Sequence, residues 1–263
     1  MMLTAGIDIG AGNSKAVVLR DSEIAGTAVI PTGHDMSKAA SDVIREACLV
    51  AGCSLDEIKY IVTTGWGRNA VPFSTKVFTE ILCQAKGIHF LIPEARTIID
   101  IGAQDTKVIR INNMGLTNNF VMNDKCAAGT GKFLDIMAKT LEVDMSEMGS
   151  FAMRSTDPCQ ISSTCAVFAE TEVISLLSRG RKREDVLHGI HRAVCIRTTA
   201  LVRTVDCEEG VVFTGGVSQN TAMKKFLEDA LKRKIVIPQE PEITCALGAA
   251  LIAENTALTE KRI

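Results

Sequence analysis

The chain has 263 residues, of which 46% are hydrophobic, and a formal net charge of −2 from 29 basic and 31 acidic residues. This length can bury one large core or two modest ones. The balanced charge argues against a nucleic-acid partner, which would need a basic stripe, and against a polybasic membrane-surface protein. No apolar run approaches the ~20 residues of a membrane-spanning helix, and the N-terminal MMLTAGIDIG lacks signal-peptide features. We therefore expect a cytoplasmic protein.

An internal repeat is the first organising feature along the chain. The tetrapeptide Asp-Ile-Gly-Ala occurs at 8–11 and at 100–103, and each copy is followed by a lysine, Lys15 or Lys107, and a β-branched run. Each copy predicts an apolar strand, a glycine-containing tip and a second strand, which together form a β-hairpin. Because residue type, order, spacing and predicted structure all match, we interpret the repeat as a duplication.

The remaining segments alternate between helical and strand patterns. Gly52 closes the first helical pattern, and Pro93 breaks the chain before the second hairpin. Hydrophobic periodicity predicts helices at about 35–52, 76–87, 129–142, 166–178, 184–205, 221–232 and 245–254, with strands at 58–64 and 211–213. The last helix, CALGAALIAE, is rich in small residues that permit close packing.

Three glycine-bearing turns point to phosphate chemistry: 8–15, 100–107 and 214–220. Consecutive N–H groups in a hairpin tip can surround a phosphate oxygen, and an Asp at the end of each first strand can hold Mg²⁺ through water. Neither hairpin is a Walker P-loop or a GxGxxG turn that opens a helix. Each turn alone fits an ordinary hairpin, but together they indicate a nucleotide site.

The Asp-Ile-Gly pair, the strand–Thr-Gly-Gly turn and the closing helix resemble the superfamily of acetate and sugar kinases, heat-shock ATPases and actin. This resemblance implies an α/β, actin-like ATPase fold: two duplicated ribonuclease-H-like lobes with a nucleotide cleft between them. We expect the first lobe to comprise 1–93 plus 247–263 and the second to comprise 94–246, which carries the cluster cysteines named below.

A narrower resemblance rests on the segments DIGAQD, MNDKCAAGTGKFLD, ISSTCAVFAETEVIS and TGGVSQN. These are similar to the ATP-dependent activators of 2-hydroxyacyl-CoA dehydratases and to related subunits of benzoyl-CoA reductases and double-cubane-cluster protein reductases. The resemblance implies that ATP hydrolysis drives low-potential electrons from a [4Fe-4S] cluster, one per homodimer, into such a partner. It also implies ferredoxin or flavodoxin as the electron donor, and ATP/ADP with Mg²⁺ as further cofactors.

The nine cysteines include no CxxC pair and, without an export signal, do not suggest a disulfide framework. Cys126 and Cys165 each precede a predicted helix, where unpaired N–H groups and the helix dipole favour a thiolate. Such a thiolate suits a nucleophile or a metal ligand, and neither motif holds a general-base histidine. Since a cubane usually needs four thiolates, two per chain form half a site that a C2 dimer would complete. We expect Cys159 to be structural.

The resemblance also implies roles for residues in the turns. We expect Asp8 to contact Mg²⁺ through water, Asp100 to help hold metal or water, and Gln104 to position water near the γ-phosphate. A turn-capping carboxylate is the alternative for either aspartate, a solvated strand lysine for Lys107, and a helix cap for Gln219. The predicted nucleotide contacts are Gly10, Ala11, Gly12, Asn13, Ser14, Lys15, Gly102, Gln104, Gly215, Gly216 and Gln219.

Two alternatives remain open from the sequence. One is a small-molecule kinase of the same superfamily, in which the cysteines are inert. The other is a nucleotide-gated assembly protein or chaperone. The sequence shows neither a substrate-binding insertion with a candidate base beyond Asp100 nor room for a client-binding domain. His188 and His191 lie one helical turn apart, and we expect an exposed helix face there rather than a zinc site.

Overall fold

The computed structural model describes residues 2–124, 126–162 and 165–260. The chain divides into two compact units. Unit 1 comprises Met1–Ala95, Ile111–Asn118 and Gln239–Ile263, and unit 2 comprises Arg96–Arg110 and Asn119–Pro238. Each unit is built on a five-stranded mixed sheet.

The strands of the described residues are β1 (Leu3–Ile9), β2 (Asn13–Arg20), β3 (Glu23–Pro31), β4 (Ile58–Thr64), β5 (Lys76–Val77), β6 (Thr97–Ile101), β7 (Thr106–Ile111), β8 (Thr117–Asn123), β9 (Val211–Thr214) and β10 (Ile235–Val236). The α-helices are α1 (Met36–Ala51), α2 (Glu80–Leu91), α3 (Gly131–Leu141), α4 (Met148–Ala152), α5 (Ala166–Ser178), α6 (Arg183–Thr204), α7 (Thr221–Leu231) and α8 (Thr244–Glu260). Across the residues that the structure describes, no helix is both long and apolar enough to cross a membrane.

The two sheets share one strand order. It is β3-β2-β1-β4-β5 in unit 1 and β8-β7-β6-β9-β10 in unit 2. In each, the first two strands along the chain form an antiparallel hairpin, and the fourth pairs in parallel with the first. The duplication predicted from the repeated tetrapeptide therefore extends over all five strands.

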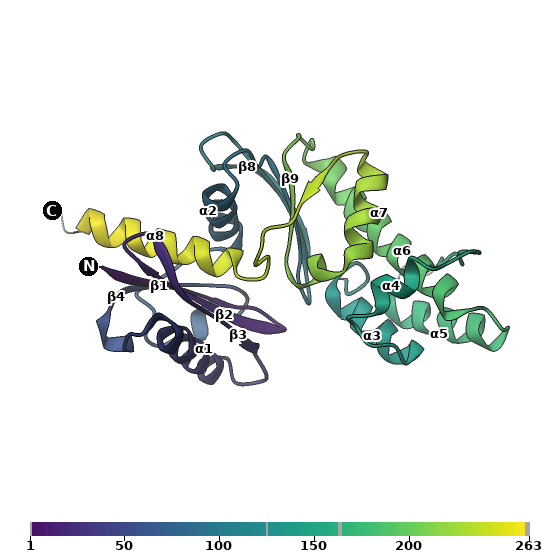
Figure 1. The fold of residues 1–263 in the computed structure, drawn as a ribbon, viewed down its shortest axis with the longest axis horizontal. Coiled ribbons are helices and arrows are strands. Elements are labelled where there is room, and N and C mark those ends of the chain that lie inside the picture. The colour runs from purple at the N-terminus through teal and green to yellow at the C-terminus, as the bar shows by residue number, and fades with distance from the viewer. Residues whose placement is uncertain (1, 125, 163–164, 261–263) are drawn as a thin grey trace. The chain divides into compact units, whose positions relative to one another are not determined.

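Small residues set the packing of unit 1, where α1 covers one face of the sheet and α8 the other (Figure 1). A Cβ atom on Gly6 of β1 would lie 2.0 Å from Ala246 O of α8. A Cβ atom on Gly248 of α8 would lie 1.7 Å from Cys83 O of α2. The small residues of the closing helix therefore allow backbone-to-backbone approach, as the sequence predicts.

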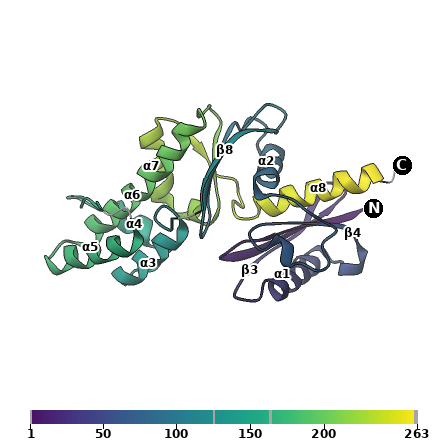
Figure 2. The same cartoon turned by 180° about the vertical axis from the view of Figure 1, so that it is seen from behind.

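Unit 2 differs from unit 1 in what joins its third and fourth strands. Unit 1 has α1 and one short 3-10 turn there, whereas unit 2 has four helices, α3 to α6. In both views α3, α4 and α5 lie together at the end of unit 2 away from β8 (Figures 1 and 2). They share one apolar core with the sheet, which includes Phe133, Met137, Val173, Ile190 and Phe213. Cys126 lies in the turn that leads to α3, and Cys165 lies directly before α5.

Most predicted elements lie within a few residues of the observed ones, but the predicted helix at 76–87 is wrong at its start. Lys76–Val77 forms the edge strand β5, which pairs with Val62 and Thr63 of β4, and helix α2 begins only at Glu80. The predicted apolar face of 129–142 is confirmed, since Phe133, Met137 and Leu141 are buried and Ile136 is half-buried.

Candidate functional site

In unit 1, Asp8 lies at the end of β1 between two partner strands. Its Cα pairs with Lys15 on β2 and with Thr64 on β4. Lys15 Nζ lies 3.3 Å from Asp8 Oδ2, and Asp8 is only 7% exposed. Gly65 follows with φ +91°, and a Cβ atom there would lie 2.4 Å from Asp8 Oδ1. The carboxylate therefore packs directly against the backbone of the Thr-Gly turn.

Unit 2 repeats this arrangement around Asp100. The Cα of Asp100 pairs with Lys107 on β7 and with Thr214 on β9. Lys107 Nζ lies 3.6 Å from Asp100 Oδ2, and Thr214 Oγ1 donates to Asp100 Oδ1 at 3.2 Å. Gly215 has φ +81°, and its Cβ would lie 2.6 Å from Asp100 Oδ1.

Sequence reasoning therefore missed one component of the repeat. It assigned a role to the glycine turn after β9, at 214–220, but none to the turn after β4. The available signal was the dipeptide Thr-Gly after an apolar strand, at 64–65 and again at 214–215. Only the strand register shows that each dipeptide lies beside an aspartate.

The structure corrects the alternative of a solvated Lys107. Its side chain is buried, with 4% of the residue exposed, and its ammonium pairs with Asp105 Oδ1 at 2.6 Å as well as with Asp100. A lysine loses its hydration on burial and needs such carboxylate partners. Lys107 therefore faces the carboxylates of Asp100 and Asp105 rather than solvent.

The two hairpin tips close in the same way. Gly10 N donates to Asn13 O at 3.2 Å, and Gly102 N donates to Asp105 O at 2.9 Å. In the second tip the side chain of Gln104 is exposed.

Side chains of the first tip also bind within unit 1. Ser14 Oγ lies 2.9 Å from Thr32 Oγ1, whose hydroxyl donates to Gly10 O at 2.7 Å. Asn13 Nδ2 donates to Glu242 Oε1 at 3.4 Å. These contacts fix the shape of the first tip.

The third turn connects β9 to α7. Gly216 and Gln219 are exposed in a short 3-10 turn, Gly216–Gln219. The helix cap is not Gln219 but Asn220, whose Oδ1 accepts from Ala222 N at 3.1 Å and from Met223 N at 3.3 Å. The alternative of Gln219 as a cap is therefore wrong, because Asn is among the strongest N-cap residues and stands at the first non-helical position.

His191 on α6 fixes the orientation of this cap. Its Nδ1 lies 2.7 Å from Leu187 O, which can only accept, so Nδ1 carries the proton. Its Nε2, 2.9 Å from Asn220 Nδ2, then accepts from the amide, and Asn220 Oδ1 is left facing α7. Burial lowers the pKa of His191, while its two hydrogen bonds act in the opposite direction, and the neutral imidazole fits both partners.

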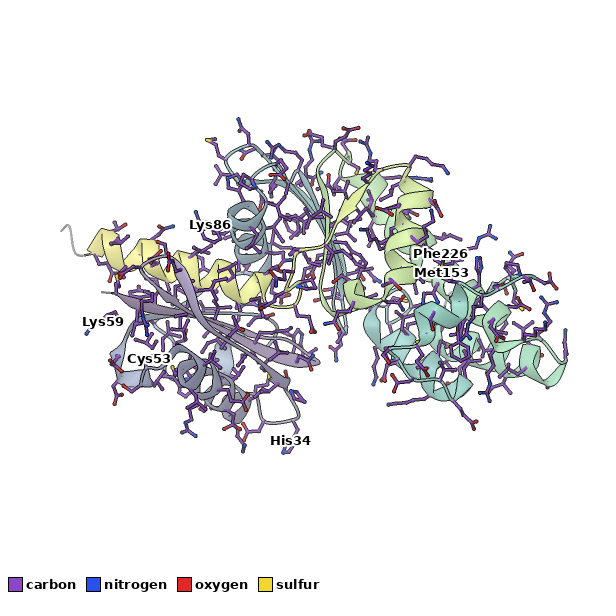
Figure 3. All side chains as sticks on the ribbon, viewed as in Figure 1. His34, Cys53, Lys59, Lys86, Met153 and Phe226 are labelled. Carbon is purple, nitrogen blue, oxygen red and sulfur yellow. The ribbon has the colours of Figure 1, made fainter. Side chains whose placement is uncertain are left out.

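The predicted exposed face for the two α6 histidines is therefore wrong for His191, which is fully buried. Phe226 of α7, labelled in Figure 3, lies edge-on to His188 with ring centroids 4.8 Å apart, and 6.0 Å from the ring of His191. His34, in contrast, projects from the exposed loop before α1 (Figure 3). None of these contacts resembles a zinc site.

Exposure separates the nine cysteines, all of which lie in the part of the chain that the structure describes. Only Cys126 and Cys165 are exposed. Burial raises the pKa values of the Cys48 and Cys83 thiols to about 12 and that of Cys195 to about 11. High pKa values and burial make these three thiols poor nucleophiles and poor ligands.

Cys159 is buried, as expected of a structural cysteine, but it is not an isolated apolar residue. Arg181 Nε donates to its Sγ at 3.1 Å, and Arg181 also pairs with Asp157 at 2.7 Å. Asp185 accepts from Ser155 Oγ and from two backbone N–H groups of the same loop. The backbone N–H of Asp157 contributes most to lowering the pKa of Asp185. Together these contacts tie the loop before α5 to the start of α6.

Cys126 and Cys165 occupy different positions relative to their helices. Cys165 is the N-cap residue of α5. Cys126 lies earlier, in the turn that leads to α3, and its carbonyl accepts from Asn123 Nδ2 at 3.1 Å. Ser162 lies three residues before Cys165. Its backbone N–H and its hydroxyl both donate to the carboxylate of Glu172 on α5. Lys125, Ser163 and Thr164 of the two cysteine motifs lie outside the described residues.

The candidate residues carry donor atoms that suit different kinds of metal. Asp8 and Asp100 supply oxygen ligands of the kind that Mg²⁺ prefers. The two exposed cysteines carry thiols, which as thiolates are soft ligands of the kind found in iron–sulfur clusters. In residues 2–124, 126–162 and 165–260, no three His, Cys, Asp or Glu side chains form a metal-sized group. Two exposed thiols are fewer than the four thiolates that a cubane usually needs.

Two sheets of one strand order, each with an aspartate and a Thr-Gly turn at corresponding strand ends, define the actin-like class of ATPase folds. A glucokinase of the ROK family from Streptomyces griseus, solved with glucose and AMPPNP, is similar over 96% of this chain and 99% of its own, with a TM-score of 0.60. At 12% identity this likeness shows the fold alone.

The chain belongs to the BadF/BadG/BcrA/BcrD ATPase family, whose model matches residues 5–253. It is 45% identical over 257 residues to the 2-hydroxyisocaproyl-CoA dehydratase activator of Clostridioides difficile, covering 97% of this chain and 96% of that protein. The solved structure of the activator from Clostridium difficile with bound ADPNP has a TM-score of 0.93 at 44% identity, covering 100% of this chain and 98% of that one. These matches confirm the resemblance to dehydratase activators, and membership of the family supports ATP binding.

Proposed function

We propose that this chain is an ATP-hydrolysing electron-transfer protein. Two copies share one [4Fe-4S] cluster through Cys126 and Cys165 of each, and ATP hydrolysis drives low-potential electrons into a partner enzyme. The observation that carries this proposal is that, of nine cysteines, these two alone are exposed. Both also lie in the helical layer that unit 2 has and unit 1 lacks.

The cluster would supply one-electron transfer at low potential. The protein's own contribution begins at Cys165, because the positive end of the α5 dipole would stabilise negative charge there by about 0.3–1 kcal/mol. For one electron, about 1.4 kcal/mol corresponds to about 59 mV. A nucleotide-dependent change in the position of α5 would therefore alter the driving force measurably.

In the nucleotide site, Asp8 would hold Mg²⁺ through water, Asp100 would hold metal or water, and Gln104 would position the attacking water. The arrangement supports these roles because both carboxylates stand at strand ends beside lysines, and Gln104 is exposed at its hairpin tip. Lys15 and the backbone of the two tips would contact phosphate. Gly215 and Gly216 would lie against adenosine, where a side chain would block approach.

The partners follow from the same proposal. Ferredoxin or flavodoxin would reduce the protein, and an iron–sulfur dehydratase or reductase, or a double-cubane-cluster protein, would accept the electron. The similar protein of Clostridioides difficile is a dehydratase activator, which supports an acceptor of the dehydratase kind.

Redox titration with and without nucleotide tests the function. We expect the midpoint potential of anaerobically purified protein to shift by tens of millivolts when ADP is replaced by ATP, and electron transfer to a dehydratase to require ATP. An unchanged potential together with nucleotide-independent transfer would contradict the proposal. Iron-free protein that turns over ATP only with a sugar or an organic acid would favour the kinase alternative.

A further inference from the structure

Helix α3 begins directly on the turn that we assign to phosphate binding in unit 2. Gly131 N donates to Gly102 O at 2.8 Å, and Lys132 N donates to Ala103 O at 2.8 Å. The first N–H groups of a helix have no partner within the helix. Here the carbonyls of the hairpin tip supply those partners, so the tip itself caps α3.

A buried hydroxyl makes a third link between the same two segments. Thr106, the first residue of β7, is 1% exposed, and its Oγ1 donates to Gly129 O at 2.8 Å. Gly129 lies in the turn that connects Cys126 to α3. Because a buried carbonyl that loses its donor is costly, this hydrogen bond ties the turn to the hairpin.

Gly131, the first residue of α3, packs tightly against two neighbouring turns. A Cβ atom on Gly131 would lie 3.0 Å from Gly102 O, 3.3 Å from Val217 Cγ2 and 3.4 Å from Ala103 Cα. Gly131 therefore packs at once against the Asp-Ile-Gly hairpin and against the turn after β9. Both of those turns carry predicted nucleotide contacts, Gly102 in one and Gly216 in the other.

We propose that Thr106 and Gly131 are positioning residues that couple the nucleotide state of the hairpin turn to the segment that carries Cys126. A change in the position of the Gly102 and Ala103 carbonyls, caused by the presence or loss of the γ-phosphate, moves the start of α3. Thr106 carries the same displacement to Gly129 and so toward Cys126. This coupling rests on the proposed nucleotide site, but it does not require the cluster to be present.

The test uses iron-free protein and the reactivity of the Cys126 thiol. Full-length wild type, Thr106→Val and Thr106→Ser are alkylated with iodoacetamide at saturating ADP and at a saturating non-hydrolysable ATP analogue. Mass spectrometry gives the rate at each cysteine, and nucleotide affinity is measured for each variant. We expect the rate at Cys126 to differ at least threefold between the two nucleotides in wild type and in Thr106→Ser. In Thr106→Val, which keeps the shape but loses the hydroxyl, we expect a difference of less than 1.5-fold.

A second variant keeps the test decisive if Thr106→Val does not fold. Gly131→Ala favours the helix but forces the tip away from α3 by a few tenths of an ångström, and it should also reduce the nucleotide-dependent difference. A wild-type difference that persists in both variants, or no difference in wild type although both nucleotides bind, would overturn the proposal. Failure to bind ATP would instead refute the proposed nucleotide site, and absence of iron in anaerobic preparations would refute only the cluster.

Discussion

Asp8 and Asp100 occupy equivalent positions in two copies of one turn, but their partners differ. Lys15 pairs with Asp8 at 3.3 Å, whereas Lys107 lies 3.6 Å from Asp100 and 2.6 Å from Asp105. The second lysine is therefore shared between two carboxylates, and its shorter contact is with Asp105. The duplicated turns have therefore diverged in how each lysine is held.

Removing either carboxylate charge should affect hydrolysis more than folding. We expect Asp8→Asn and Asp100→Asn each to lower the ATPase kcat by roughly 100-fold, because each removes a charge that would stabilise the metal–phosphate assembly. Asp56→Asn, in an exposed 3-10 turn, serves as the matched control and should leave kcat unchanged. Wild-type kcat in both site variants would exclude these aspartates from catalysis.

The Thr-Gly turn of unit 2 should not tolerate a side chain. Gly215→Ala places a Cβ 2.4 Å from Ile101 O at φ +81°, whereas Gly33→Ala meets nothing within 4 Å at φ +64°. Both substitutions incur about 1–2 kcal/mol of backbone strain, and only Gly215→Ala adds about 1–3 kcal/mol of overpacking. In urea unfolding, the free energy of unfolding of Gly215→Ala should therefore be lower than that of Gly33→Ala by about 1–3 kcal/mol. Equal losses would show that crowding at Gly215 is unimportant.

The buried His191 should make the protein less stable in mild acid. Burial holds its pKa below the ordinary 6.5, so at low pH the unfolded chain binds a proton that the folded chain does not. Its contribution to stability is therefore complete above pH 6.5 and falls below it, by at most about 1.4 kcal/mol per pH unit. The pKa of His188 is also lowered, so wild type must be compared with His191→Gln. Between pH 7.5 and pH 5.5 the urea midpoint should decrease more in wild type than in His191→Gln. Equal decreases in the two proteins would exclude the effect.

Thiol reactivity in iron-free protein should follow exposure. We expect iodoacetamide to modify Cys126 and Cys165 at least tenfold faster than Cys48, Cys83 and Cys195 at pH 8, because burial and raised pKa values protect the latter three. Mass spectrometry of tryptic peptides gives the order directly. Rapid modification of Cys83, which is fully buried, would show that unit 1 opens on this timescale.

The sequence was most informative where the local pattern and the tertiary environment agree. The helix after Cys165, predicted to end near Ser178, spans Ala166–Ser178, and the strand predicted at 58–64 spans Ile58–Thr64. Both have clear boundaries, a capping position in one and a glycine turn in the other. The repeated Asp-Ile-Gly motif likewise predicted the duplication, because two hairpins with the same buried strands must be built alike.

Other features depend on contacts that no local pattern encodes. Lys76–Val77 forms a strand only because β4 presents an open edge beside it. The burial of Lys107 depends on two carboxylates that converge only when β6 and β7 pair. His191 was expected on an exposed face, and its burial follows from the packing of α6 against α7. The capping of α3 by the Gly102 and Ala103 carbonyls joins backbone groups and so has no residue-type signature.

Iron content measured beside matched cysteine variants tests the central claim most directly. Protein purified without oxygen should be brown and carry about four iron atoms per dimer, as one shared cubane requires. Cys126→Ser and Cys165→Ser should each lose this iron, whereas Cys207→Ser, at a half-buried thiol, should keep it. Colourless wild-type protein, or full iron content in either of the first two variants, would contradict the shared cluster.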